Sequence, residues 1–261
     1  FTIDIGPDTS MCGGSFILDA STNTGNVTYS WNNGSNDSTL NVTSSGLYWV
    51  EVDNNGCKDR DTANIQIHTL PTANFSWNGG CAGELVQFTD LSQSNINTWL
   101  WDFGDNTVTT NSNPSHTYNT AGSYGVVLNV TDINGCTASF FSSIQIDSTF
   151  SISTSNDTTL CANDFAITAS GPSGSTYFWS NNATTASTTI SNSGTYSVTV
   201  SKGSCTYTDD VTVDLKPIPV ADFYINDSCA FILHEIFDNS SSNIISWSWT
   251  LPDSSNSNNQ N

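Results

Sequence analysis

Hydrophobic and polar residues alternate in short runs along the whole chain, with a period of two residues. In the first quarter of the sequence these runs predict strands at Thr2–Ile5, Phe16–Ala20, Val27–Trp31, Thr39–Val42, Leu47–Val52 and Ala63–Ile67. Such alternation turns one strand face toward a core and the other toward solvent, and no segment shows the 3.6-residue period of an amphipathic helix. Asn-Gly pairs such as Asn55-Gly56 supply the positive φ angles of tight hairpins between runs. The pattern predicts an all-β fold built from many short strands.

The pattern repeats when the chain is shifted against itself by 148 residues. The pairs that align include Trp31 with Trp179, Cys57 with Cys205, Pro71 with Pro219 and Trp101 with Trp249. Self-similarity on this scale predicts an array of modules. An array more often supplies reach and repeated binding surface than a single catalytic pocket.

Short links divide this array into four expected domains, spanning residues 1–69, 70–147, 148–217 and 218–261. The last of these is shorter than the others and holds only part of the repeated unit. Because the links are too short to act as a slack Gly/Ser tether, we expect the sandwiches to stack end to end as an elongated rod.

Each of the three complete modules carries a candidate core tryptophan in its third strand and a Gly-x-Tyr-x-Val run later in the module. The tyrosine opens a strand after a turn, as in the tyrosine corner of immunoglobulin-like sandwiches. The residues expected in the three cores are Trp31, Trp101, Trp179, Tyr48, Tyr124 and Tyr196.

The chain carries 24 acidic and 4 basic residues, which gives a formal net charge of −20. Affinity for nucleic acid depends on Lys and Arg that neutralise phosphates, so we expect no nucleic acid partner. Anionic membrane surfaces are disfavoured for the same reason. No apolar stretch is long enough to span a bilayer, so we expect no membrane insertion in this segment.

The second module closely resembles a PKD domain in five short runs. These runs are Ala73-Asn74-Phe75, Val86–Asp90, Trp101-Asp102-Phe103-Gly104-Asp105, Pro114–Tyr118 and Gly122-x-Tyr124. The first and third modules are similar to the immunoglobulin-like repeats that alternate with PKD domains in giant surface adhesins, which gliding bacteria export by type IX secretion. The fourth module departs from the family run, with Trp249-Thr250-Leu251-Pro252-Asp253 in its place.

This resemblance implies a non-enzymatic repeat segment of an extracellular or cell-surface adhesin or filament, with a role in adhesion, motility or cell contact. The segment would act as a stiff spacer and a multivalent binding surface, with no catalytic residues. Its implied partners are a surface glycan or protein on another cell or substratum and further modules of the same chain. Assembly of identical chains into a homo-oligomer stays open. The alternative is a set of accessory or spacer modules of a secreted polysaccharide hydrolase or protease.

Seven cysteines occur at regular places in the modules, two in each complete module and one in the last. They are Cys12, Cys57, Cys81, Cys136, Cys161, Cys205 and Cys229. This regularity predicts a disulfide framework formed in an oxidising compartment.

In an immunoglobulin-like sandwich, the first cysteine of each module would lie in a turn at the opposite end from the final hairpin, which carries the second. A strand of about seven residues separates those ends by roughly 23 Å, too far for a disulfide. We therefore expect bonds between modules, Cys12 with Cys136 and Cys81 with Cys205. Cys57, Cys161 and Cys229 would then pair with modules outside this stretch of sequence. Pairing within modules stays open as the alternative: Cys12 with Cys57, Cys81 with Cys136 and Cys161 with Cys205.

Candidate chemistry is sparse. Asp102 and Asp105 are close carboxylates, but we expect them to organise a turn rather than flank a substrate cleft. His116 is expected to pack in the sandwich, and the His234-Glu235 pair lacks the second histidine of a zinc-protease helix. No cofactor is expected, with calcium as an open candidate. Its candidate ligands are the carboxylates of Asp53, Asp59 and Asp61.

Overall fold

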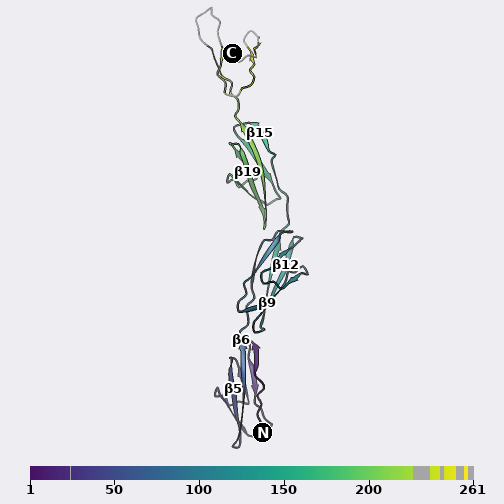
Figure 1. Cartoon of the computed structure of the whole chain (residues 1–261), viewed down its shortest axis with the longest axis vertical. Helices are drawn as coiled ribbons and strands as arrows, with labels where there is room; N and C mark the ends of the chain where they lie inside the picture. The colour runs from purple at the N-terminus through teal and green to yellow at the C-terminus, as the bar shows by residue number, and fades with distance from the viewer. Residues whose placement is uncertain (24, 226–235, 242–243, 251–255, 258–261) are drawn as a thin grey trace, which may run out of the picture. The chain divides into compact units, whose positions relative to one another are not determined.

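The computed structural model describes residues 1–23, 25–225, 236–241, 244–250 and 256–257 (Figure 1). Every regular element in these ranges is a β-strand, which confirms the all-β prediction of tandem sandwiches. The described residues contain no helix with both the length and the apolar character that a membrane span requires. The chain forms two compact units, Phe1–Thr149 and Phe150–Asn261.

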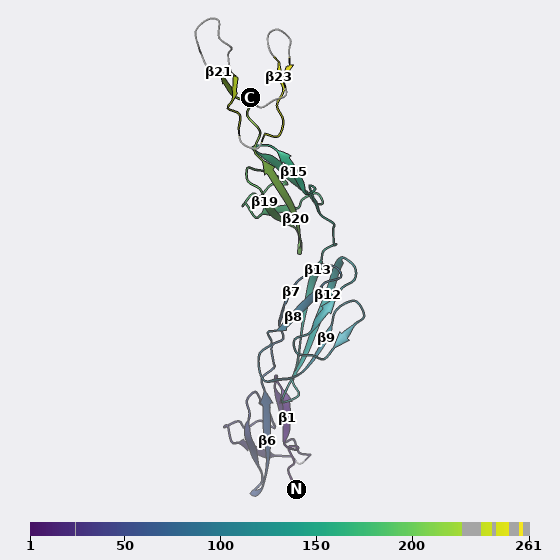
Figure 2. The ribbon, with the colours of Figure 1, turned by 45° about the horizontal axis from the view of Figure 1, so that its top comes forward.

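The first domain places two sheets around one core. Its strands are β1 (Thr9–Cys12), β2 (Phe16–Asp19), β3 (Val27–Trp31), β4 (Thr39–Val42), β5 (Gly46–Asn54) and β6 (Cys57–His68). One sheet has the order β1-β6-β5-β3, and the other pairs β2 with β4. β1 runs parallel to β6, with Cys12 opposite His68, and the two strands lie side by side in Figure 2.

The segment Thr2–Ile5 does not form the strand that its alternation predicted. The backbone N–H of Ile3 instead donates to the Asp59 carboxylate, and that of Ile5 donates to Asp61, both at 2.8 Å. In a strand, these backbone N–H groups would donate to the carbonyls of a neighbouring strand. Here they donate to side-chain carboxylates instead. The prediction was wrong because these two carboxylates, which face the segment from β6, replace the strand ladder.

The second domain is a sandwich of a four-stranded and a three-stranded sheet. Its strands are β7 (Phe75–Asn78), β8 (Leu85–Asp90), β9 (Ile96–Asp102), β10 (Val108–Thr109), β11 (Ser115–Thr117), β12 (Gly122–Asp132) and β13 (Thr137–Ile146). The sheet orders are β10-β9-β12-β13 and β11-β8-β7. Residues from both sheets, among them Phe75, Trp101 and Leu128, form one buried core.

The third domain repeats the plan of the first within the second unit. Its strands are β14 (Ser153–Thr154), β15 (Thr158–Cys161), β16 (Phe165–Ser170), β17 (Thr176–Trp179), β18 (Ser187–Ile190), β19 (Gly194–Lys202) and β20 (Cys205–Lys216). The sheet orders are β15-β20-β19-β17 and β14-β16-β18. β15 runs parallel to β20 as β1 does to β6, so an early strand pairs in parallel with the last strand in both domains.

Four short strands follow the third domain. They are β21 (Phe223–Ile225), β22 (Ile236–Asp238), β23 (Trp249–Thr250) and β24 (Asn256–Ser257). β21 pairs with β22 so that Phe223 lies opposite Asp238, and β7 pairs with β8 in the matching register, Phe75 opposite Asp90. The start of this segment therefore repeats the first hairpin of the second domain.

Candidate functional site

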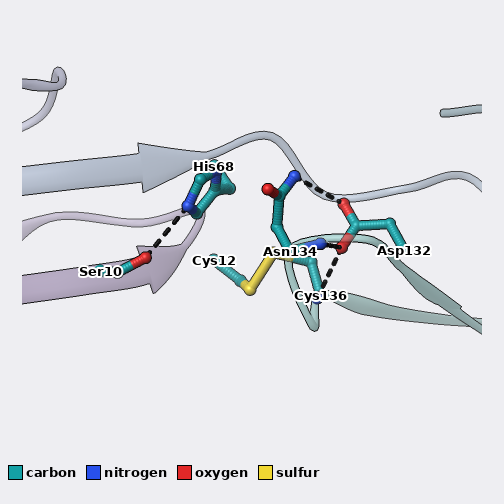
Figure 3. The surroundings of a disulfide bond; sticks show 6 residues. All are labelled: Ser10, Cys12, His68, Asp132, Asn134 and Cys136. Atoms are coloured by element: carbon teal, nitrogen blue, oxygen red, sulfur yellow. Dashed lines mark hydrogen bonds between the residues drawn. A yellow bond between two sulfur atoms is a disulfide. The ribbon is translucent and has the colours of Figure 1, made fainter. Parts of the chain in front are cut away.

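A disulfide bond joins Cys12 of the first domain to Cys136 of the second, with a Cα–Cα distance of 5.5 Å (Figure 3). Cys12 is the last residue of β1, beside His68 at the end of β6. Cys136 follows the Asn134-Gly135 turn that connects β12 to β13, where Gly135 has a φ of +81°. The bond therefore ties the first strand of one domain to the last hairpin of the next.

The alternative pairing within domains is wrong for the described cysteines. Cys12 and Cys136 bond each other, while Cys57 and Cys161 are free and exposed. The reason is distance. Cys12 lies opposite His68, the last residue of the twelve-residue strand β6, whereas Cys57 is the first residue of β6. A strand of that length spans roughly 36 Å, far beyond the reach of a disulfide.

The other cysteine predictions have different outcomes. Cys81 and Cys205 are both buried, 1% and 0% exposed. They belong to separate units, and their pairing stays a prediction. Cys229 lies outside the described residues.

Polar groups of both domains surround the Cys12–Cys136 bond (Figure 3). The Asp132 carboxylate accepts hydrogen bonds from the N–H groups of Asn134 and Cys136, both at 2.8 Å. Burial of this carboxylate, which is 4% exposed, raises its pKa. The hydrogen bonds and the positive field of His68 outweigh that cost, so the pKa of Asp132 lies below its ordinary value.

Ser10 and His68 complete the surroundings of the bond, because the Ser10 hydroxyl lies 3.0 Å from His68 Nε2. A serine, a histidine and an aspartate thus lie near one another, as in a hydrolytic triad. In a triad, however, the aspartate orients the imidazole through a direct hydrogen bond. Asp132 instead accepts hydrogen bonds from Asn134 and Cys136 of its own hairpin. The arrangement fits a structural joint rather than a nucleophile.

The link between the first two domains is held at both of its ends. Gly13 N–H donates to the His68 carbonyl at 2.8 Å. On the other side, Thr72 and Gln93 exchange backbone hydrogen bonds of 3.3 and 2.8 Å. With the disulfide, these contacts leave little of the short link free to bend.

The three candidate core tryptophans are buried, with Trp31 2% exposed and Trp101 and Trp179 0% exposed. Each indole N–H donates to a backbone carbonyl: Trp31 to Asp37, Trp101 to Asn111 and Trp179 to Thr185, at 2.8 to 2.9 Å. Burial of the large ring therefore leaves none of these three indole N–H groups unpaired.

The three candidate tyrosines repeat one hydrogen bond. Each hydroxyl donates to the carbonyl four residues upstream: Tyr48 to Ser44, Tyr124 to Thr120 and Tyr196 to Asn192, at 2.8 to 2.9 Å. This is the geometry of a tyrosine corner, which fixes the turn that precedes the strand.

The carboxylates of the Trp101–Asp105 run organise a turn. Asp102 accepts from Gly104 N–H at 2.9 Å, and Asp105 accepts from Thr107 N–H at 3.1 Å. His116 Nε2 lies 2.7 Å from Asp105, and its ring stacks on Phe103 with centroids 4.3 Å apart. Burial raises the pKa of Asp105, but the bonds from Thr107 and His116 bring it below its ordinary value. His234-Glu235 lies outside the described residues.

The calcium candidates are not gathered around a common point. Asp59 and Asp61 bind the Ile3 and Ile5 backbone, and Asp53 accepts from Gly56 N–H at 2.6 Å in a hairpin. Within the described ranges, no group of three or more His, Cys, Asp or Glu side chains is placed to hold a metal ion. Each of these carboxylates thus has a backbone partner that accounts for it.

Several residues of the junction were missed by the sequence analysis, namely Ser10, His68 and Asp132. A signal for Asp132 was present, because Asp132-x-Asn134-Gly135-Cys136 has the same spacing as Asp53-x-Asn55-Gly56-Cys57. No signal identified His68, because its place beside Cys12 depends on the parallel pairing of β1 with β6.

Residues 70–148 match the family model of the PKD domain. A microbial collagenase of Vibrio alginolyticus is 40% identical over 63 residues, which are 23% of this chain and 8% of the collagenase. The PKD1 domain of the Vibrio cholerae metalloprotease PrtV is 33% identical in its crystal structure; the match covers 30% of this chain and 98% of that one, with a TM-score of 0.29.

The structure of Sidekick-1 immunoglobulin domains 1–5 is 13% identical and matches 81% of this chain and 58% of that one, with a TM-score of 0.35. The chain spans less than a tenth of the length of the curated relatives it matches, 8% of the collagenase and 6% of PrtV. The second domain matches the PKD family, and the chain is a tandem of β-sandwich domains.

Proposed function

We propose that this chain is a non-catalytic segment of a large extracellular adhesin or filament on the cell surface, acting as a stiff spacer and a multivalent binding surface. Domains of the PKD and immunoglobulin-like kinds are typically non-catalytic modules. A disulfide between domains is typical of proteins in an oxidising, extracellular compartment.

The observation that carries this proposal is the route that the Cys12–Cys136 bond gives to a pulling force. A force applied at the ends of the first unit passes from β1 through the disulfide to the last hairpin of the second domain. The chain segment between the two cysteines, which are 124 residues apart, then carries none of this force and is not extended. A fully extended chain of that length spans about 400 to 450 Å. A joint of this kind suits a module that bears load between a cell and its target.

The net charge of −20 supports the same proposal, because it keeps the segment soluble and disfavours nonspecific contact with anionic surfaces. Many hydroxyl and amide side chains suit weak contacts that add up when domains are repeated. The proposed partner is a surface glycan or protein on another cell or substratum.

A second candidate function rests on the similarity to the collagenase and to PrtV. In this version, the modules are accessory or spacer domains of a secreted protease or polysaccharide hydrolase. The two candidates differ in what the modules bind, a foreign surface or the substrate of an attached enzyme.

The test uses beads coated with the full chain, held under flow over mammalian cells, bacterial cells, purified polysaccharide or fibrillar collagen. The adhesin proposal expects retention on cells, with faster loss under flow after reduction or in Cys12→Ser/Cys136→Ser. Retention on collagen or polysaccharide alone would instead support the accessory role. If the purified chain itself cleaves collagen or casein, both candidates are wrong.

A further inference from the structure

We propose that the outer edge of β13, in the second domain, binds an extended peptide segment of a partner protein, which adds to the sheet as a further strand. The segment would carry apolar and hydroxyl side chains along the paired stretch, with Lys or Arg beside it. The inference goes beyond the proposed function, because it assigns a binding mode to one strand and holds for an adhesin and for an accessory module alike. It rests on a difference between the last strands of the three sandwiches.

β13 lies at the edge of its sheet, next to β12 in the order β10-β9-β12-β13 (Figure 2). It runs for ten residues, Thr137–Ile146, and is the longest edge strand in the part of the chain that the structure describes. A strand of this length spans roughly 33 Å. Along an edge strand, alternate backbone N–H and C=O groups point away from the sheet and can pair with another chain.

The last strands of the first and third domains are covered on this edge by a strand of their own domain. β1 pairs in parallel with residues 65–68 of β6, and β15 pairs in the same way with residues 213–216 of β20. In the second domain this pairing is reduced to one bridge between Cys81 and Asp147, beyond the end of β13. The preceding strand β7 pairs instead with β8 in the other sheet. The described residues therefore leave the outer edge of β13 without a neighbouring strand.

A second difference lies at one position of the last strand, opposite the valine of each Gly-x-Tyr-x-Val run. That position holds Asp61 in the first domain, Ser142 in the second and Asp209 in the third. The Asp61 carboxylate accepts from Ile5 N–H at 2.8 Å, and the Asp209 carboxylate accepts from Thr154 N–H at 3.0 Å. Both carboxylates thus hold an earlier segment of their own domain against the last strand. The Ser142 hydroxyl makes no hydrogen bond to the residues that the structure describes.

The composition of β13 also differs from that of the other two last strands. Soluble proteins commonly block edge strands with charged residues or proline. β6 carries four consecutive charged residues, Lys58–Asp61, and β20 carries Asp209 and Asp210. β13 contains no charged residue and no proline from Thr137 to Ile146. It therefore lacks the residues that usually oppose pairing with another strand.

The side chains beside this edge favour apolar residues in an added strand. Ala138 and Phe140 pack against the core of the second domain, and the Phe140 ring meets that of Phe75 with centroids 5.3 Å apart. Trp77 also contacts Phe75, at 6.2 Å, and remains 39% exposed. On the solvent face, Phe141 is 64% exposed. An added strand would place alternate side chains beside Phe140 on one face and beside Phe141 on the other.

Charge favours a basic partner segment over a second copy of this chain. Residues 70–147 include no Lys or Arg and six acidic residues, which are Glu84, Asp90, Asp102, Asp105, Asp132 and Asp147. Two copies joined along β13 would bring two such domains together, and their like charges would repel. Lys or Arg beside the paired stretch of a foreign segment would be attracted instead. The main-chain hydrogen bonds would supply affinity, and the alternate side chains would supply specificity.

The binding test uses the full chain and a fluorescent synthetic peptide of alternating threonine and valine with two lysines at each end. Fluorescence anisotropy should show saturable binding that weakens as salt is added. A peptide with glutamate in place of lysine should bind more weakly. A lysine peptide with N-methyl groups on two adjacent central residues loses one backbone donor from each edge, and its affinity should fall by roughly tenfold or more. The absence of saturable binding, or equal binding of the three peptides, overturns the proposal.

Ser142→Asp and Ser139→Asp form a matched pair, because they add the same charge to opposite faces of β13. Ser142→Asp introduces the carboxylate that the first and third domains carry at this position. An added strand would bury that carboxylate without a partner, so the peptide affinity should fall at least about tenfold. Ser139 is exposed on the solvent face, and Ser139→Asp should not lower the affinity. Equal losses in the two variants, or no loss in Ser142→Asp, contradict the proposal, and circular dichroism is the control for folding.

Hydrogen exchange and sedimentation of the chain without peptide identify competing occupants of the edge. The β13 N–H groups that do not bond β12 should exchange rapidly and become protected when the lysine peptide is added. Protection without peptide in a monomeric chain would show that another segment of the same chain covers the edge. A dimer that Ser142→Asp dissociates would show that a second copy occupies it. Either result overturns the assignment of this edge to a partner peptide.

Discussion

Cys12 and Cys136 are 124 residues apart in the sequence and are joined by a disulfide that connects two separate hydrophobic cores. Replacing both by serine should lower the free energy of unfolding of Phe1–Thr149 by about 2 to 5 kcal/mol, because the unfolded chain loses a long cross-link. Urea unfolding followed by tryptophan fluorescence measures this change.

The matched control for that variant is Cys57→Ser/Cys161→Ser, which removes two exposed free thiols. It should change the stability by less than about 0.5 kcal/mol when unfolding is measured in the same way. An equal loss in the two double variants would mean that cysteine chemistry, rather than the bond, accounts for the effect.

The tyrosine corners predict a repeated, moderate effect. Tyr48→Phe, Tyr124→Phe and Tyr196→Phe each remove one hydroxyl that donates to a carbonyl four residues upstream. Each should destabilise its own domain by about 0.5 to 1.5 kcal/mol, which is the usual net value of such a bond. Thermal unfolding with and without each substitution provides the measurement. Tyr29→Phe is the control, because Tyr29 packs against the core of the first domain and the described residues offer its hydroxyl no partner.

The sandwich fold could be predicted because each strand carries its own alternation. Val50 and Val52 face the core while Leu47 is 61% exposed. The alternation that predicts this arrangement lies within the single run Leu47–Val52. The all-β tandem and the PKD resemblance of the second module were confirmed for this reason. Local patterns of this kind need no knowledge of distant partners.

Features that depend on distant partners could not be derived from local patterns. The parallel pairing of β1 with β6 joins residues 56 apart, Thr9 to Ile65, and no run of either strand indicates the direction. The replacement of a first strand at Ile3 and Ile5 by contacts with Asp59 and Asp61 likewise depends on carboxylates far along the chain. His68 and Ser10 became part of the candidate site through the same pairing.

Acid should weaken the second domain through Asp105. Its hydrogen bonds with Thr107 and His116 hold its pKa below the ordinary value in the folded state. In the unfolded chain the pKa is about 3.9, so the stabilisation is fully present above about pH 4 to 5 and is lost as the pH falls through the lower folded value. Asp105→Asn should cost about 1.5 to 3 kcal/mol at neutral pH and flatten the acid limb of stability.

Urea unfolding of the wild-type chain and Asp105→Asn across the acid range measures both effects. Asp164→Asn, at an exposed position of the third domain, is the control and should leave the acid limb unchanged. The assignment to Asp105 is wrong if the asparagine variant loses stability with acid as steeply as the wild-type chain.

Gly104 shows why the Trp101–Asp105 run requires a glycine at its fourth position. Its φ is +78°, and a Cβ built there would lie 2.5 Å from the Gly125 carbonyl oxygen and 2.9 Å from its nitrogen. Both contacts are with backbone atoms of β12, which cannot move aside as a flexible side chain could. Gly104→Ala should therefore cost more than the conformational strain alone, in total above about 3 kcal/mol.

Gly135→Ala is the matched control because it changes only the backbone strain. Gly135 has nearly the same φ, +81°, and a Cβ there would meet nothing within 4 Å. We expect it to cost about 1 to 2 kcal/mol, the penalty of a left-handed conformation for alanine. Thermal and urea unfolding of the two variants should thus differ by at least about 1 kcal/mol, and failure of only Gly104→Ala to fold would agree with the larger cost. Equal losses would show that the close approach to Gly125 is relieved by movement of the turn, and that conformational freedom alone accounts for the glycine.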